Sequence, residues 1–251
     1  MSVFTLLLIG LFLPLFPFSI VFNHLLERLR HPLLRVGLLL LWPQLGVALF
    51  LWAGDEAVPS WVLAWAALTA LLYAFRLLTQ RDVNGWVGFL ATSAWSLLWF
   101  ALPGAGQHAA LVMDALGFSI PLALLALLAV ALEQRFGAAY THLYGGLAGI
   151  MPRFAGLLVF STLAATATPI FPAFFIMLKT LTLSSPLSAV VVLLTWLIWS
   201  WAGVRLLQGL LVGAAPQNQQ VSDLPRGLSW AFALTLTVLV VAGLFLTGDI
   251  A

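Results

Sequence analysis

The chain has 251 residues, of which 63% are hydrophobic and only 7% are charged, with a formal net charge of +2. Soluble domains carry about 25% charged residues, so this composition predicts an all-α integral membrane protein. The sequence has no cysteine, which excludes disulfides, cysteine-ligated zinc and iron–sulfur clusters within the chain. Its basic residues form no run that could follow a phosphate backbone. We therefore expect no metal, no cofactor and no nucleic-acid partner.

Apolar stretches long enough to cross a bilayer, which takes about 17 to 25 residues, follow one another along the whole sequence. They predict about eight transmembrane helices, at residues 3–22, 33–53, 60–78, 86–102, 109–132, 154–181, 186–213 and 228–247. The first stretch has no positive charge before it and no small-residue cleavage site. We interpret it as a retained helix and not as a signal peptide.

Arginines predict the orientation of these helices. All of them lie beside the first, third, fifth or seventh connection, at Arg28, Arg30, Arg35, Arg76, Arg81, Arg135, Arg153, Arg205 and Arg226. The even connections have none. By the positive-inside rule the odd connections are cytoplasmic and both termini lie outside. We expect a multi-pass protein of the bacterial inner membrane.

Tryptophans near the ends of the predicted helices fit an aromatic belt at the two membrane surfaces. The outer group would be Trp52, Trp61 and Trp99, and the inner group Trp86 and Trp230. No function is assigned to four others, Trp42, Trp65, Trp196 and Trp201.

The sixth apolar stretch, 154–181, is longer than a straight span requires and contains Pro169 and Pro172. Small and hydroxyl residues, including Thr166 and Thr168, come just before the two prolines. This pattern predicts a discontinuous helix whose freed carbonyls face protein or water, with the two threonines as candidate water ligands. The alternative is a simple proline kink that the threonine hydroxyls relieve.

The only lysine of the chain, Lys179, lies within this apolar stretch beyond the prolines. Asp114 lies about 7 to 8 Å into the fifth helix from its outer end, at a comparable depth. A charge in hydrocarbon is costly and often marks an ion pathway. We predict a carboxylate and an amine that share or exchange a proton. In the alternative interpretation Lys179 reaches the outer interface and Asp114 is a hydrated interfacial carboxylate.

Two further ionisable residues are accessory candidates for proton transfer. His108 is expected in a Gly- and Pro-containing outer loop, where a solvated loop residue is the simpler interpretation. Glu133 ends the fifth helix on the cytoplasmic side, and we expect it to pair with Arg135 at the interface. The sequence shows no nucleophile triad or metal cluster, so no catalytic residue is assigned and the chain is not expected to be an enzyme on its own.

Four runs, in this order, resemble motifs of antiporter-like proton-channel subunits. The run LTQRDVNGWVGFLATSAWSLLWF (78–100) is similar to a DLKR-type loop that opens a helix reading AYSS. Residues 115–156 are similar to the family's HGxS helix, its Glu-Arg end and its GGLA-x-x-MP loop. TPIFPAFFIMLKT (168–180) resembles the family's proline-broken helix. WAGVRLLQGLLVG (201–213) resembles the helix that follows, with its late arginine.

This family supplies membrane subunits of respiratory complex I, Mrp-type sodium/proton antiporters, membrane hydrogenases and bacterial inorganic-carbon accumulation complexes. Full members resemble two inverted helical units. The resemblance implies a shortened form, in which 1–55 form two N-terminal transmembrane helices and 56–251 form a six-helix half-channel unit. The other half-channel, with its glutamate and lysine, would be absent.

The charged residues depart from the family pattern. The resemblance places the ionisable residue of the broken helix at Met177, two residues before Lys179, and the family's histidine at Leu116, two residues after Asp114. Because these helices are antiparallel, both offsets move the charge outward by about 3 Å. The lysine of the DLKR motif is replaced by Asn84. One interpretation is a half-channel with a relocated charged pair, and the alternative is a degenerate, non-conducting copy.

These observations predict a membrane subunit of a multi-subunit proton-translocating complex that helps conduct H⁺, or alternatively Na⁺. It would couple the ion gradient to a partner's work, with Lys179 as relay base and Asp114 as its outer partner. The expected partners are other membrane subunits, either a fuller antiporter-like channel or a catalytic subunit. The alternative is a non-conducting membrane scaffold that docks such a subunit, and a stand-alone transporter is the least favoured interpretation.

Overall fold

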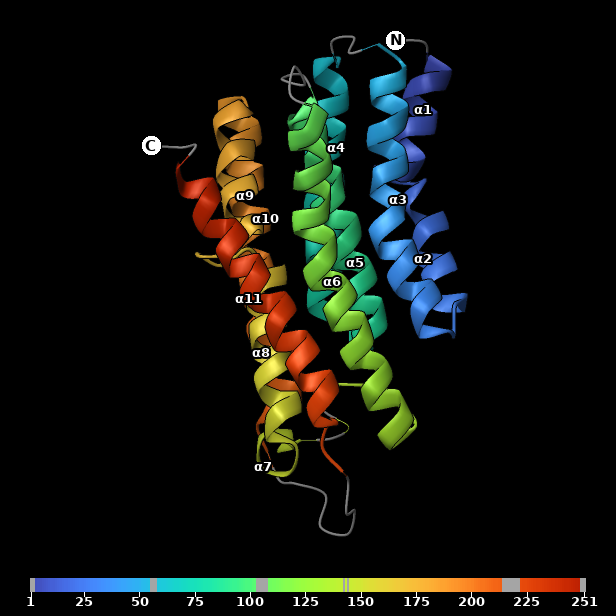
Figure 1. Ribbon diagram of the computed structural model, residues 1–251. Coiled ribbons are helices and arrows are strands. Elements are labelled where there is room, and N and C mark those ends of the chain that lie inside the picture. Colours follow the sequence, from blue (N-terminus) through green and yellow to red (C-terminus); the bar gives the residue numbers. More distant parts are fainter. Residues whose placement is uncertain are drawn as a thin grey trace.

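In a computed structural model the chain is a bundle of helices that run between two ends, called here the upper and lower ends as drawn in Figure 1. The structure describes residues 3–54, 58–102, 108–141, 143, 145–213 and 222–248. The helices are α1 (Val3–Phe12), α2 (Ser19–Arg28), α3 (Pro32–Trp52), α4 (Ser60–Thr79), α5 (Val83–Leu97), η1 (Leu98–Phe100), α6 (His108–Phe136), α7 (Leu147–Ile150), α8 (Pro152–Ala165), α9 (Pro172–Leu183), α10 (Pro186–Leu211) and α11 (Arg226–Gly248).

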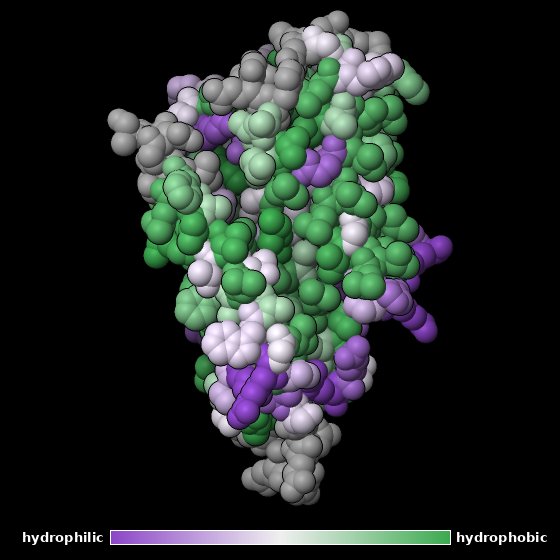
Figure 2. Space-filling model, in the orientation of Figure 1, coloured by the Kyte–Doolittle hydropathy of each residue, from purple (hydrophilic) through white to green (hydrophobic). Residues whose placement is uncertain are grey.

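Five of the helices in the described part of the chain are long and apolar enough to cross a membrane: α3, α4, α6, α10 and α11. The shorter helices α1 and α2 follow one another from the upper toward the lower end, and α8 and α9 do so in the opposite direction (Figure 1). Hydrophobic side chains cover most of the visible face, and hydrophilic ones gather toward its lower part (Figure 2). The chain is therefore a multi-pass membrane protein.

Helix α5 lies at the centre of the bundle, and all of its residues except the half-buried Phe89 are buried. It contacts α2, α4, α6 and α10. A helix that is apolar or small-sided all round is buried in this way. Gly88 allows α2 to approach, because a Cβ there would lie 2.8 Å from Asn23 Oδ1. At the lower end Asp82 caps α5, with Oδ2 accepting a hydrogen bond from Gly85 N at 2.9 Å.

The first apolar stretch, expected as one helix, is interrupted. Helix α1 ends at Phe12 and α2 begins at Ser19, and the intervening segment contains Pro14 and Pro17. Three indole N–H groups donate to carbonyls at this break: Trp42 to Leu11 at 3.2 Å, Trp99 to Leu13 at 3.0 Å and Trp65 to Phe16 at 2.8 Å. These bonds satisfy carbonyls that a membrane interior would leave without a donor.

The predicted aromatic belt is only partly correct. Trp52, Trp61 and Trp230 are exposed, as expected for side chains at a membrane surface. The prediction is wrong for Trp86 and Trp99, which are 2% and 0% exposed and lie in the core. Both lie near helix ends, but the segments that carry them are surrounded by other helices.

A polar cluster at the lower end joins α3, α5 and α6. Arg35 Nη1 donates to Asn84 Oδ1 at 2.8 Å and to Glu133 Oε2 at 3.2 Å, and Asn84 Nδ2 donates to Glu133 Oε1 at 2.6 Å. The expected pairing of Glu133 with Arg135 is wrong, because Arg135 Nε donates instead to the backbone oxygen of Ser222. Residues two apart on a helix do not face each other, whereas α3 presents Arg35 directly to Glu133.

Replacing Glu133 with glutamine should test the contribution of this cluster to stability. Glu133→Gln keeps the shape of the side chain but removes the charge that balances Arg35, whose side chain is only 8% exposed. Since Glu133 itself is 32% exposed, we expect a loss of about 2 kcal/mol in the free energy of unfolding, between the values for exposed and buried pairs. Unfolding of the purified protein in detergent measures it. The control is Glu27→Gln, at an exposed carboxylate of the same end, and equal stability of the two variants would contradict the prediction.

Candidate functional site

The segment between α8 and α9 leaves the helical path. Helix α8 ends at Ala165 and α9 begins at Pro172. Within the segment Ala167 has φ 56° and Ile170 has φ 88°. A positive φ is unusual for any residue with a Cβ and is a clear outlier for a β-branched one. Each such residue costs of order 1 to 3 kcal/mol and persists only where the surroundings impose it, often at functional sites.

Side chains satisfy several carbonyls around this break. The donors are two threonine hydroxyls and one indole: Thr166 Oγ1 to Thr162 O at 2.9 Å, Thr168 Oγ1 to Leu163 O at 2.9 Å and Trp196 Nε1 to Ala167 O at 3.1 Å. The threonine hydroxyls relieve the break, as the proline-kink interpretation expects. Each hydroxyl oxygen keeps acceptor capacity that water can use.

The structure brings together the two charges that the sequence singled out. Lys179 Nζ of α9 donates to Asp114 Oδ2 of α6 at 2.7 Å. The side chain of Asp114 is only 10% exposed, whereas that of Lys179 is 39% exposed. By helical rise Asp114 lies about 9 Å below the first residue of α6. The pair is therefore well inside the upper part of the bundle, with its lysine facing outward more than its carboxylate.

Gly117 sets the distance between the two helices that carry the pair. A Cβ on Gly117 would lie 2.6 Å from Ile176 Cδ1 and 3.3 Å from Pro172 Cβ. Gly117 is about one turn from Asp114, and Ile176 is about one turn from Lys179. A larger side chain at position 117 would push α9 away from α6. The glycine thus lets the lysine and the carboxylate meet.

No charge lies at the depths where the family resemblance would place it. Met177 is fully buried in the core, and Leu116 is a half-buried apolar residue. The ionisable groups of α6 and α9 in this region are Asp114 and Lys179, each two residues nearer the upper end. The pair occupies a shallower level than the family pattern implies.

Below the pair the interior contains neutral polar groups. Several bridge helices through hydrogen bonds: Ser19 Oγ with Tyr73 Oη at 2.8 Å, Asn23 Nδ2 to Thr92 Oγ1 at 2.9 Å, Trp95 Nε1 to Ser119 Oγ at 3.1 Å and Trp199 Nε1 to Ser93 Oγ at 2.9 Å. Hydroxyl, amide and indole groups can hold water but do not ionise near neutral pH.

Two buried hydroxyls close to the break were not singled out from the sequence. Ser161 Oγ and Thr162 Oγ1 have no hydrogen-bond partner among the described residues, and their exposures are 0% and 1%. Buried polar atoms are usually paired, so an unpaired one marks a place for an ordered water. Their run of small and hydroxyl residues before Pro169 was the available signal. That signal predicted the break but not which hydroxyls remain unpaired.

The two accessory candidates do not join the pair. His108 is the first residue of α6 and not a loop residue, and its side chain lies outside the described residues. Glu133 belongs to the cluster with Arg35, near the other end of the same helix. The rise along α6 separates it from Asp114 by about 28 Å. Direct proton exchange between Glu133 and the pair is excluded by this distance.

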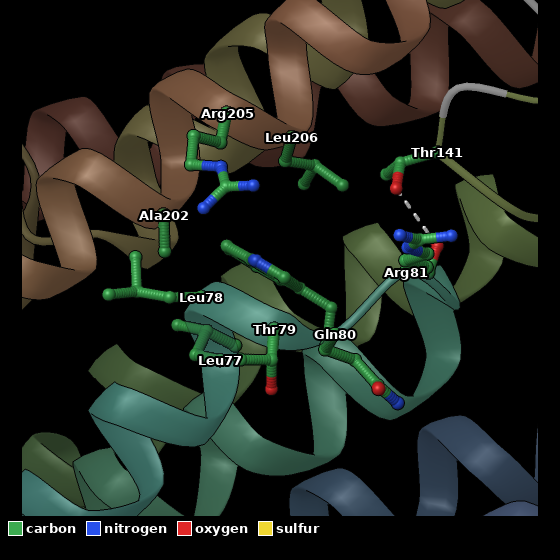
Figure 3. Close-up of a pocket in the computed structure, with 10 residues that line it drawn as sticks. Leu77, Leu78, Thr79, Gln80, Arg81, Thr141, Ala202, Arg205 and Leu206 are labelled. Atoms are coloured by element: carbon green, nitrogen blue, oxygen red, sulfur yellow. Dashed lines mark hydrogen bonds between the residues drawn. The ribbon is translucent and has the colours of Figure 1, made fainter.

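A cavity of about 310 Å³ opens at the lower end between α10 and the α4–α5 connection. Figure 3 shows Arg205 of α10 on one side of it, and Gln80 and Arg81 on the other. Thr141 donates to Arg81 O at 3.2 Å at its edge. The lining residues include two arginines and no carboxylate. The cavity is therefore positively charged, a property that no sequence motif indicated.

No family model and no curated protein matches the chain. Solved structures do match it. A chain of respiratory complex I from Thermus thermophilus is 24% identical with a TM-score of 0.81, and the match covers 94% of this chain and 53% of that one. A chain of the membrane-bound sulfane sulfur reductase, an archaeal respiratory membrane complex, is 17% identical with a TM-score of 0.79, covering 96% and 52%.

A chain of the Mrp complex from Dietzia sp. is 15% identical with a TM-score of 0.75, and the match covers 96% of this chain and 55% of that one. The chain thus spans about half the length of the structures that it matches. At these identities the likeness shows the fold. The resemblance to antiporter-like subunits, drawn from four sequence motifs, is confirmed at the level of the fold.

Proposed function

We propose that this chain is a membrane subunit of a proton-translocating complex and provides the outer part of a proton path. The observation that carries the proposal is the 2.7 Å ion pair between Asp114 and Lys179, adjacent to a strained break between two helices. Its fold is shared with chains of a respiratory complex and of the Mrp complex. Na⁺ is the alternative ion. Ionisable residues inside membrane-spanning segments are rare and commonly belong to ion pathways.

The proposed topology has eight spans in a bacterial inner membrane: α1 with α2, α3, α4, α5 with η1, α6, α8 with α9, α10 and α11. The two broken spans are discontinuous transmembrane helices. Both termini are outside, so the upper end of Figure 1 is the outer side. The N-terminal unit, 1–55, packs directly on the half-channel unit, 56–251, through contacts of α2 with α5 and α3 with α6.

The pair can pass a proton because each partner stabilises the charge of the other. When Asp114 takes up a proton from water at the break, its negative charge disappears. The ammonium of Lys179 is then left without its counter-ion, passes its proton to water, and is recharged by the proton held on Asp114. Since the lysine side chain is the more exposed partner, release occurs toward the outer side. Waters held near Ser161 and Thr162 supply the inner part of this short path.

Partner subunits complete the path in this proposal. Among the described residues, the hydrogen-bonded polar groups between the pair and the lower cluster are neutral, and the next carboxylate along α6 is Glu133 in that cluster. The partners are a fuller antiporter-like channel, a catalytic subunit, or both. Such a chain couples the ion gradient to their work without being an enzyme itself.

The second candidate function is a non-conducting scaffold. The positively charged cavity with Arg81 and Arg205 favours it, because that cavity suits an acidic segment of a docked subunit. The threonine bonds at the break also agree with a structural kink. The relay function requires Lys179 to exchange a proton, whereas the scaffold function does not.

Reporter fusions test the topology. A reporter fused after Ala251 should lie in the periplasm, and one inserted near Gln217 should lie in the cytoplasm, because the arginines mark the odd connections as cytoplasmic. Both positions lie outside the described residues. The reverse location at either site would rule out the eight-span arrangement.

Partner dependence gives a second test. Purified alone and reconstituted into liposomes, the chain should carry no proton flux, because the described hydrogen-bonded groups between the pair and Glu133, about 28 Å away along α6, are neutral. From native membranes it should co-purify with at least one other membrane protein. Robust proton flux through the isolated chain would contradict the proposed half-path.

Substitutions of the pair separate relay from scaffold. In the native complex reconstituted into liposomes, Lys179→Met and Asp114→Asn should each reduce proton flux by at least about tenfold, a lower bound below the roughly 10²- to 10⁴-fold that a positioned proton-transfer group contributes. Lys179→Arg keeps the positive charge, but its proton flux should also stay low, because a guanidinium scarcely deprotonates. Complex yield should stay normal. The matched control is Leu183→Met, a change between apolar side chains at an exposed position on the same helix.

A third variant separates the charges without altering either. Gly117→Leu should displace α9 and lower proton flux as Lys179→Met does, provided the complex still assembles. If Lys179→Met leaves flux intact, or lowers it only in proportion to lost assembly, the lysine is structural and the scaffold function holds.

A further inference from the structure

A groove of about 820 Å³ runs along the surface between α8 and α11. Its lower end carries two arginines, Arg153 and Arg226, and Ser229. Above them the lining is mostly apolar and reaches Phe171 at the start of α9 and Val240 on α11. The charged side chains thus lie at one end of this lipid-facing groove, and the rest of its lining is mostly apolar.

The groove exists because α11 is held close to its neighbours at two points. At the upper point a Cβ on Gly243 would collide with Ile170 O, so α11 touches the break directly. At the lower point the carboxylate of Asp223, just before α11, accepts hydrogen bonds from the first backbone amides of α8, at Arg153 and Phe154. Between these points Gly156 of α8 and Ala233 of α11 line the gap, and α11 crosses α8 at an angle (Figure 1).

The dimensions fit one phospholipid of the inner leaflet. From Arg226 to Val240 the rise along α11 is about 21 Å. Half of a bilayer, with its headgroup layer, is about 20 to 22 Å thick.

The charges fit an anionic headgroup. Arg153 Nη1 uses one donor on Leu224 O at 2.9 Å, and a guanidinium has further donors. The Asp223 carboxylate is engaged by backbone amides, so the two arginines and this aspartate leave one net positive charge. Trp230, 75% exposed one turn above Arg226, is placed as an interfacial tryptophan would be.

We propose that the groove binds an anionic phospholipid, with its phosphate between Arg153 and Arg226 and an acyl chain along α8 and α11 up to the break. The chain end then contacts Phe171, at the strained segment that precedes α9. The lipid supports α11 against this segment, independently of the proton chemistry at the ion pair.

Native mass spectrometry of the full purified chain tests the proposal with two probes, phosphatidylglycerol and phosphatidylcholine of identical acyl chains. Phosphatidylglycerol should be retained preferentially. The double variant Arg153→Gln/Arg226→Gln should weaken this preference by about thirtyfold, since two arginines each favour an anionic lipid. The matched control Arg28→Gln/Arg30→Gln, which changes two exposed arginines of the same end, should leave it unchanged.

A second variant fills the groove and keeps both arginines. Gly156 lines the groove and has open space around its Cβ position. Gly156→Leu should therefore fold normally and lose retention of phosphatidylglycerol. Gly37→Leu, at a helical glycine with similar open space on α3, is the control. If the arginine variant does not fold, retention of phosphatidylglycerol by Gly156→Leu alone tests the proposal.

Three results would overturn the proposal. One is equal retention of the two lipids by the unaltered chain. Another is unchanged retention of phosphatidylglycerol in both Gly156→Leu and the arginine variant. The third is a cross-link from position 233, placed within the groove, to a partner protein and not to lipid in native membranes.

Discussion

A carbonyl released by a helix break inside a membrane finds no hydrogen-bond donor in the surrounding lipid, and this constraint shapes the whole bundle. Both breaks are closed by indole N–H groups that come from neighbouring helices. Trp99 donates to Leu13 O at 3.0 Å at the first break, and Trp196 donates to Ala167 O at 3.1 Å at the second. An indole has a donor and no acceptor, so it satisfies a carbonyl without adding a new unpaired group. The tryptophans therefore hold the irregular segments in place from neighbouring helices.

The second break differs from the first because a charge pair lies beside it. Breaking a buried pair by removing one partner is costly, since the remaining charge is stranded. The Asp114 carboxylate is well shielded and the Lys179 ammonium is not, so the pair has an inner and an outer member. Gly117 fixes the spacing of the helices that carry them. At Ile170, φ 88° departs from helical geometry, and the surrounding packing must hold the segment in this strained conformation. Together these features give a local site whose charge can change while the helices of the bundle stay packed.

The sequence was sufficient for the membrane class, the second break and the meeting of Asp114 with Lys179, because hydropathy, proline chemistry and helical rise are local or periodic signals. It did not predict the first break, where Pro14 and Pro17 were treated as part of one apolar span. It also paired Glu133 with the wrong arginine. Which of several arginines meets a carboxylate depends on packing between α3 and α6, and no spacing within one helix contains that information. The burial of tryptophans was missed for the same reason.

Whether Asp114 changes protonation during turnover is the most direct question for this account. Infrared difference spectroscopy of the native complex in liposomes, recorded when a proton gradient is imposed, can answer it. The account predicts the carbonyl stretch of a protonated carboxyl group, shifted in heavy water and absent from the Asp114→Asn variant. Identical difference spectra for the unaltered complex and Asp114→Asn would contradict it, because the Asp114–Lys179 pair would then remain ionised and serve only to hold α6 and α9 together.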